Sequence, residues 1–320
     1  MKQEEIISFY SYLQSQKTAQ DYLKQCYEKI PGVDAEKKSY ENANTFLYYL
    51  AHGRQFYENG KNLDLLLQPL LYFYGMVHLL KACLLTERPE YPESTSVLAH
   101  GVSARKRKKR NYIFSEDEVR IQHNGLLPYF TKHLFHLKYL PFEKIDMSRL
   151  LRLIPEISPL FSWHQQQPPL ICIGSQGDPN LRFPLMLLDR YHLTKQAFVQ
   201  RIKGYVARNS IHSSYEDVST LYMEVTAPVD EAHSPFFLDS TQNIYFPADR
   251  KQCLSLPEAV VHYLLLYNLS MLSRYEAEWW GELLVTKSDV DFPLISQFLK
   301  VTADKMPLYL GNELYKRFIH

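Results

Sequence analysis

The stretch PLLYFYGMVHLLKACLL, residues 69–85, decides the fold that we expect for this chain. Apolar side chains recur in and just before it at three- and four-residue spacing on two faces: Leu66, Leu70, Phe73, Val77, Leu80 and Leu84 on one, and Leu67, Leu71 and Tyr74 on the other. A helix that is apolar on two sides packs against neighbours on both. We therefore predict a helix over residues 64–85 in the middle of a helical bundle. Polar residues interrupt it at Asp64, Gln68, His78 and Lys81, so we expect no membrane span.

The remaining chain divides into helical ends and a strand-rich centre. Helical spacing continues through the N-terminal residues and returns in segments such as VVHYLLLYNLSMLSRY, residues 260–275. Between these ends, short strand-like segments such as LICIG (170–174) and NIYFP (243–247) surround one amphipathic helix, expected over residues 194–207. The pattern predicts a mainly α fold with a small central antiparallel β-sheet, the α+β class.

We expect the whole chain, residues 1–320, to form one domain. It would be assembled from N-terminal helices (1–86), a basic loop with a short hairpin and helices (87–165), a strand-rich insert (166–250) and C-terminal helices (251–320).

Composition indicates a folded cytoplasmic protein. Hydrophobic residues make up 46% and aromatic residues 14% of the chain, which is far from the profile of a disordered protein. The four cysteines stand singly, without a CxxC pair, as is typical of reduced thiols, and we expect no metal, no cofactor and no disulfide. The N-terminal segment MKQEEIISFYSYL lacks the long apolar core of a signal peptide, so we expect neither secretion nor membrane attachment.

A run of six cations follows the central helix and is the strongest candidate for a binding site. It consists of Arg105, Lys106, Arg107, Lys108, Lys109 and Arg110, on a chain whose net charge is only +1. Such a concentration of positive charge suits phosphate, nucleic acid or an acidic protein surface. The alternative is a solvated loop. A hairpin between residues 111–114 and 118–122 would bring Glu116, Asp117 and Glu118 next to the cations and neutralise them.

Candidates for catalysis are weaker, because the chain contains no GxxxxGK[ST], GxGxxG, HExxH or GxSxG motif. An arginine and a histidine close together can stabilise a phosphate and move a proton, which singles out Arg208 and His212. They equally fit a cationic end to the helix expected before them. His100 and His78 are further candidates, although a lone histidine is more often a structural hydrogen-bonding group.

Several segments in order resemble the YaaC-like protein family of bacilli and their relatives. They are PLLYFYGMVHLLKACLL (69–85), SVLAHGVSARKRKK (96–109), YIFSEDEVRIQ (112–122) and VVHYLLLYNLSMLSRYEAEWW (260–280). The resemblance covers essentially the whole chain, and it implies no established biochemical activity.

A local resemblance also connects the central helix with HEPN helical domains. It rests on Tyr72, Tyr74, Met76, His78, Lys81 and Ala82, followed by His100-Gly101. Many HEPN domains are RNases or partners of nucleotidyltransferases, and catalytic members carry an arginine, a polar residue and then a histidine four to six positions later. Arg208-Asn209 to His212 is similar to this motif but one residue short.

Three functions follow as hypotheses. The first is binding of nucleic acid or another phosphorylated or acidic partner through residues 105–110. The second is a HEPN-like, metal-independent RNase that uses Arg208 with His212, or Arg105 with His100. The third is a non-catalytic protein-interaction module whose aromatic helices bind a partner protein or form a homodimer.

Overall fold

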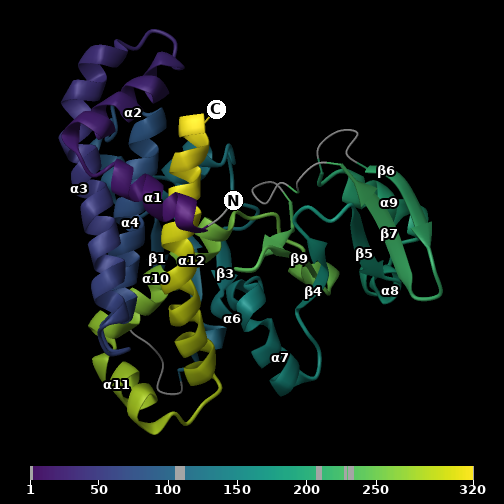
Figure 1. Cartoon of the computed structure of the whole chain (residues 1–320). Coiled ribbons are helices and arrows are strands. Elements are labelled where there is room, and N and C mark those ends of the chain that lie inside the picture. Colours follow the sequence, from purple (N-terminus) through teal and green to yellow (C-terminus); the bar gives the residue numbers. More distant parts are fainter. Residues whose placement is uncertain (1–2, 105–111, 207–210, 227–228, 230–233, 320) are drawn as a thin grey trace. The chain divides into compact units, whose positions relative to one another are not determined.

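The computed structural model describes residues 3–104, 112–206, 211–226, 229 and 234–319, and of His212 it describes the backbone alone. The chain folds into two compact units (Figure 1). Unit 1 takes in the described residues of 1–113, 117–145 and 262–320, and unit 2 those of 114–116 and 146–261. Whether the two units act as the single domain expected from the sequence stays a prediction.

Unit 1 is built mainly of helices. In chain order its elements are α1 (Gln3–Tyr12), α2 (Gln16–Glu28), α3 (Ala35–Lys61), α4 (Gln68–Glu87), the 3-10 helix η1 (Thr95–Leu98), β1 (Val102–Ala104), β2 (Glu118–Ile121), α5 (Leu126–Leu134), β3 (Lys144–Asp146), α10 (Glu258–Tyr275), α11 (Ala277–Thr286) and α12 (Asp291–Ile319). The last residue of β3 and the first turn of α10 belong to unit 2. In Figure 1, α3 and α4 run side by side and α12, in yellow, lies along α4.

The central helix of unit 1 is α4, as its two apolar stripes predict. It contacts α2, α3, α5 and α12. Within the described part of the chain it is also the one helix long and apolar enough to cross a membrane, yet 72% of its apolar window is buried inside the protein. Its apolar surface therefore forms the core of the unit, as the core helix of a soluble protein does.

Two glycines let α3 and α4 approach closely. A Cβ atom at Gly75 would lie 2.8 Å from the ring of Tyr57, and one at Gly53 would lie 2.7 Å from the side chain of Leu79. Both distances are shorter than atoms in a close-packed interior tolerate. The close approach places side chains of α3 in direct contact with those of α4.

The acidic segment after residue 111 does not form the hairpin expected from the sequence. Phe114–Glu116 form the 3-10 helix η2, and β2 pairs antiparallel with β1, with Val102 opposite Ile121. Phe114 is the first residue of this helical turn, and its side chain is fully buried. Asp117 accepts hydrogen bonds from Tyr112 Oη at 2.8 Å and Asn268 Nδ2 at 2.9 Å, so its carboxylate is directed to other groups of unit 1.

Unit 2 contains most of the strands. Its elements are η2, α6 (Met147–Leu151), the 3-10 helix η3 (Pro155–Ile157), α7 (Ser158–Gln165), β4 (Leu170–Ser175), β5 (Asn180–Pro184), α8 (Met186–Tyr191), α9 (Lys195–Lys203), β6 (Ile211–Glu216), β7 (Thr220–Val225), β8 (Phe237–Leu238), β9 (Asn243–Pro247) and the 3-10 helix η4 (Arg250–Gln252). They form two three-stranded antiparallel sheets, in the orders β4-β9-β8 and β5-β7-β6.

The core of unit 2 lies between these strands and α9. Leu181 and Phe183 of β5 alternate inward and pack with Phe198 of α9 and Phe246 of β9. Thr194 caps α9, because its Oγ1 accepts a hydrogen bond from the backbone N–H of Ala197. The mainly α fold with small antiparallel sheets is thus confirmed, although the strands of the described residues are distributed over three sheets, one in unit 1 and two in unit 2, and not over a single one.

Candidate functional site

Several of the predicted site residues lie outside the described residues. These are the cationic run Arg105–Arg110 and Arg208. The backbone of His212 belongs to β6, whereas α9 ends at Lys203, so His212 lies on a strand and not at the end of a helix. The expected pairing of Arg208 with His212 therefore stays a prediction. His78 and His100 are both described, and both belong to unit 1.

The backbone around His100 is held by a close crossing of two loops. Gly101 and Gly125 have φ angles of +75° and +124°, and a Cβ atom at Gly125 would lie 2.4 Å from the backbone nitrogen of Gly101. Only glycine adopts this conformation at this distance without strain. The carbonyl of His100 accepts hydrogen bonds from the backbone N–H of Leu127 at 3.1 Å and from Tyr263 Oη at 2.8 Å.

The imidazole of His100 lies among aromatic rings and has an unused nitrogen. Its ring centroid is 4.9 Å from that of Phe73, 6.2 Å from that of Tyr74 and 5.8 Å from that of Tyr267. The Nδ1 atom is buried and has no hydrogen-bond partner in the part of the chain that the structure describes. A buried polar atom without a partner is uncommon and is often explained by an unseen water or ligand.

His78 on α4 has a similar environment. Its ring stacks on Phe56 of α3 with 5.7 Å between centroids, and it meets His52 edge-on at 5.4 Å. Its Nδ1 atom is also buried, and no described residue forms a hydrogen bond with it. One turn further along α4, the ammonium group of Lys81 lies 5.6 Å from the centroid of Tyr49.

Aromatic rings connect the two histidines. Phe56 stacks on His78 and lies 6.4 Å from Tyr74, which in turn contacts His100. We call this set the histidine–lysine face. It consists of Tyr49, His52 and Phe56 of α3, Tyr74, His78 and Lys81 of α4, and His100. His52 is exposed, and the other six members are partly exposed, so solvent reaches the face along its length.

The face carries one cation, Lys81, beside histidines that burial keeps neutral at neutral pH. Burial, followed by the neighbouring Lys81 and His52, lowers the pKa of His78 to about 4. Burial, followed by Arg274 and Lys81, lowers the pKa of His100, and burial lowers the pKa of Lys81. Lys81 makes no ion pair with any carboxylate of the described residues. A bound anion would stabilise the protonated form of all three groups.

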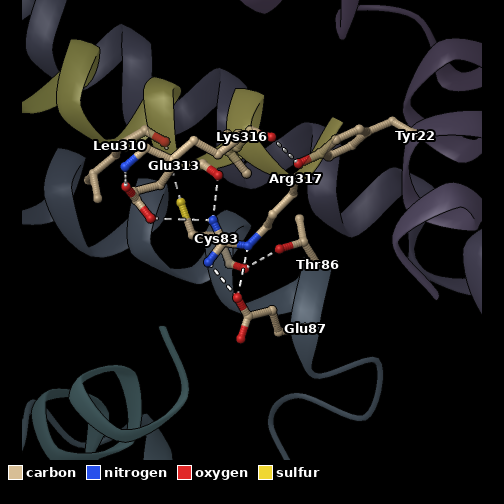
Figure 2. Close-up of polar contacts among 9 residues, drawn as sticks. Tyr22, Cys83, Thr86, Glu87, Leu310, Glu313, Lys316 and Arg317 are labelled. Carbon is tan, nitrogen blue, oxygen red and sulfur yellow. Dashed lines mark hydrogen bonds and ion pairs between the residues drawn. The ribbon is translucent and has the colours of Figure 1, made fainter. Parts of the chain in front are cut away.

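A second polar cluster in unit 1 is closed and structural. Figure 2 shows Arg317 of α12 between Glu87 of α4 and Glu313, with which it forms ion pairs. Cys83 points to the carbonyl of Leu310 at 3.6 Å, and burial raises the pKa of its thiol to about 12. A thiol with so high a pKa is not a nucleophile at neutral pH. These contacts join α12 to α4, so we interpret the cluster as structural.

Sequence reasoning found the two histidines but missed the residues that join them. Tyr74, His78 and Lys81 follow one another at four- and three-residue spacing, which places them on one face of a helix. That signal could have indicated the α4 half of the face. Phe56 and His52 become part of it only through the packing of α3 on α4.

One comparison with known proteins gave a match. A family model described as YaaC-like Protein matches residues 11–314, which includes nearly all elements of both units. Searches among curated proteins and among solved structures gave no significant match. The resemblance to HEPN helical domains has no counterpart in this match and stays a prediction. Because the family model extends over almost the entire sequence, the chain belongs to the YaaC-like protein family.

Proposed function

We propose that this protein is a cytoplasmic protein that binds single-stranded nucleic acid through the histidine–lysine face. The observation that carries the proposal is the partly buried Lys81, which has no carboxylate partner among the described residues and lies beside two histidines with unused buried nitrogens. Burying a cation without a partner is costly unless a ligand supplies the negative charge.

The alternation of rings and cations favours nucleic acid over other anions. Single strands are bound by aromatic side chains that stack on bases and by cations that contact phosphates. Tyr49, Phe56 and Tyr74 supply partly exposed rings, and Lys81 lies among them. The cationic run at 105–110 begins five residues after His100 in the sequence and would add phosphate contacts.

Binding of a fluorescein-labelled single-stranded RNA of 16 nucleotides, followed by anisotropy at several salt concentrations, tests the proposal. We expect the logarithm of the association constant to fall linearly with the logarithm of salt concentration, and Lys81→Gln to reduce that slope by about 1. Replacing Arg105, Lys106 and Arg107 together with alanine should reduce it by about 2.

Lys37→Gln is the matched control. Lys37 is an exposed lysine of α3, about 22 Å along that helix from His52, and its replacement removes the same charge as Lys81→Gln. The proposal fails if the parent protein does not bind RNA, if binding does not depend on salt, or if Lys37→Gln and Lys81→Gln weaken it equally. It also fails if polyglutamate competes as well as unlabelled RNA, because that result assigns the face to an acidic protein partner.

The same samples distinguish binding from catalysis. A denaturing gel of the incubated RNA should show no cleavage. Cleavage that is lost in His212→Ala or His100→Ala, with the fold intact, would replace binding alone by the RNase hypothesis.

A further inference from the structure

Unit 2 contains an open hollow that no part of the proposed function uses. It has a volume of 480 Å³ and lies between the short helix α6 and η4. Its lining consists of Asp146, Ser148, Arg149, Arg152, Lys251 and Gln252. Three cations and one carboxylate leave the lining with a formal charge of +2. Ligand sites for small molecules commonly have volumes of about 300–1,000 Å³, so the hollow is large enough for one.

The two guanidinium groups are held in place by neutral partners. Arg149 donates from Nη2 to the backbone carbonyl of Lys251 at 2.9 Å. Arg152 donates to Ser148 Oγ at 3.4 Å and to Gln165 Oε1, and its guanidinium lies 4.6 Å from the ring centroid of Phe161. Side chains fixed in this way keep their orientation before a ligand arrives.

None of the three cations forms an ion pair within the described part of the chain. The one lining carboxylate, Asp146, uses Oδ1 to accept a hydrogen bond from the backbone N–H of Arg149 at 2.8 Å and so caps α6. Burial lowers the pKa of Arg152, and the nearby Asp146 acts against that shift. The lining cations are therefore only partly compensated, by the one carboxylate of Asp146, and form no ion pair among the described residues.

One lining atom also lacks a hydrogen-bond donor. The side-chain oxygen Oε1 of Gln252 is buried and has no hydrogen-bond partner among the described residues. A buried acceptor without a donor is unfavourable. The hollow thus presents cations for an anionic group, and the polar side chains of Ser148 and Gln252 for a hydroxylated one.

We propose that this hollow is a second ligand site, which binds a phosphomonoester carrying hydroxyl groups, such as a nucleotide or a sugar phosphate. A phosphomonoester has a charge of about −2 at neutral pH, which matches the charge of the lining. The planar forks of Arg149 and Arg152 suit bidentate contacts with phosphate oxygens, and Lys251 adds a point charge. The hydroxyl of Ser148 and the Gln252 oxygen then contact the remainder of the ligand.

Isothermal titration calorimetry of the full chain with adenosine 5′-monophosphate, ribose 5-phosphate and adenosine tests this site. We expect at least one of the two phosphomonoesters to bind and adenosine not to bind. Lys251→Gln should weaken binding about five- to tenfold, because it removes one charge-assisted contact. Arg152→Lys should also weaken it, since the charge remains but the fork is lost.

Arg250→Gln is the matched control, because Arg250 is an exposed neighbour in the same turn that does not line the hollow. It should leave phosphomonoester affinity unchanged within twofold. Absence of binding by both phosphomonoesters, equal binding of adenosine, or equal effects of Lys251→Gln and Arg250→Gln would overturn the assignment. Both variants alter exposed side chains of one 3-10 turn, so loss of folding does not obscure the comparison.

Discussion

Removal of the Arg317 guanidinium should destabilise the protein far more than removal of its neighbour Lys316. Arg317 ties the last turn of α12 to the last turn of α4 through Glu87, and it also contacts Glu313 on its own helix (Figure 2). The side chain of Arg317 is 16% exposed and that of Glu313 is 15% exposed. Replacement by methionine keeps much of the apolar stem but removes the cation that pairs with Glu87, and leaves Glu313 with Lys316 as its remaining cation partner among the described residues.

The structure sets the size of the effect. Breaking a buried ion pair costs about 3–5 kcal/mol, whereas an exposed pair contributes about 0–1 kcal/mol. Glu87 is 30% exposed and so keeps part of its hydration. We therefore expect Arg317→Met to lower the free energy of unfolding by about 2–4 kcal/mol. Lys316 is 54% exposed and pairs with Glu313 at 2.8 Å, so Lys316→Met should cost less than about 1 kcal/mol.

Urea unfolding followed by circular dichroism at 222 nm measures both changes, with the slope of free energy against urea compared between variants. A double-mutant cycle with Glu87→Gln should give a coupling energy of at least about 1 kcal/mol between Arg317 and Glu87. The reasoning is refuted if Arg317→Met and Lys316→Met differ by less than about 0.5 kcal/mol.

Two further predictions concern α4. Gly75→Ala should destabilise the protein by about 1–3 kcal/mol, because its new methyl group meets the Tyr57 ring. Gly281→Ala in α11 is the control: a Cβ there meets nothing within 4 Å, so this change should stabilise the protein by about 0.5–1 kcal/mol. Changes of the same sign in the free energy of unfolding of the two variants would contradict this. The unfolded protein takes up a proton at His78 near the ordinary pKa of 6.5, but the folded protein does so only near 4, so stability should fall as the pH drops between these values. Between pH 7 and pH 5, His78→Phe should reduce the loss of unfolding free energy by about 1 kcal/mol, a value that allows for the exposed part of the ring. If urea unfolding gives the same loss for the variant and the parent, His78 does not have this role.

Parts of the fold were predictable because the signal is local. The stripe that includes Phe73, Val77, Leu80 and Leu84 lies at helical spacing and is buried, whereas the second stripe, Leu67, Leu71 and Tyr74, is exposed or only partly buried. Strand β6 was missed for the opposite reason. It lies at the edge of its sheet, and its sequence IHSSYE has four exposed residues in a row, so no apolar alternation marks it.

The candidate site was only half predictable. His78 and His100 could be singled out as residue types, whereas Lys81 was noted as an interruption of an apolar helix and as part of the HEPN resemblance, and not as a binding residue. Phe56 is 22 residues before His78 in the sequence, and its stacking on that ring depends on how closely Gly53 and Gly75 let α3 approach α4. A pattern within one helix carries no information on such a distance between two helices.

The loop crossing at Gly101 and Gly125 has a consequence for the evolution of His100. The main chain of His100 is fixed by its own carbonyl and by its neighbours, and the ring nitrogen Nδ1 contributes no bond to that arrangement. The fold would therefore tolerate another aromatic side chain that keeps the ring contacts with Phe73, Tyr74 and Tyr267, while the two glycines are constrained by sterics. If related sequences retain both glycines, the close approach of the two backbones is enough to explain it. Retention of the histidine between them would instead require selection on what its side chain binds.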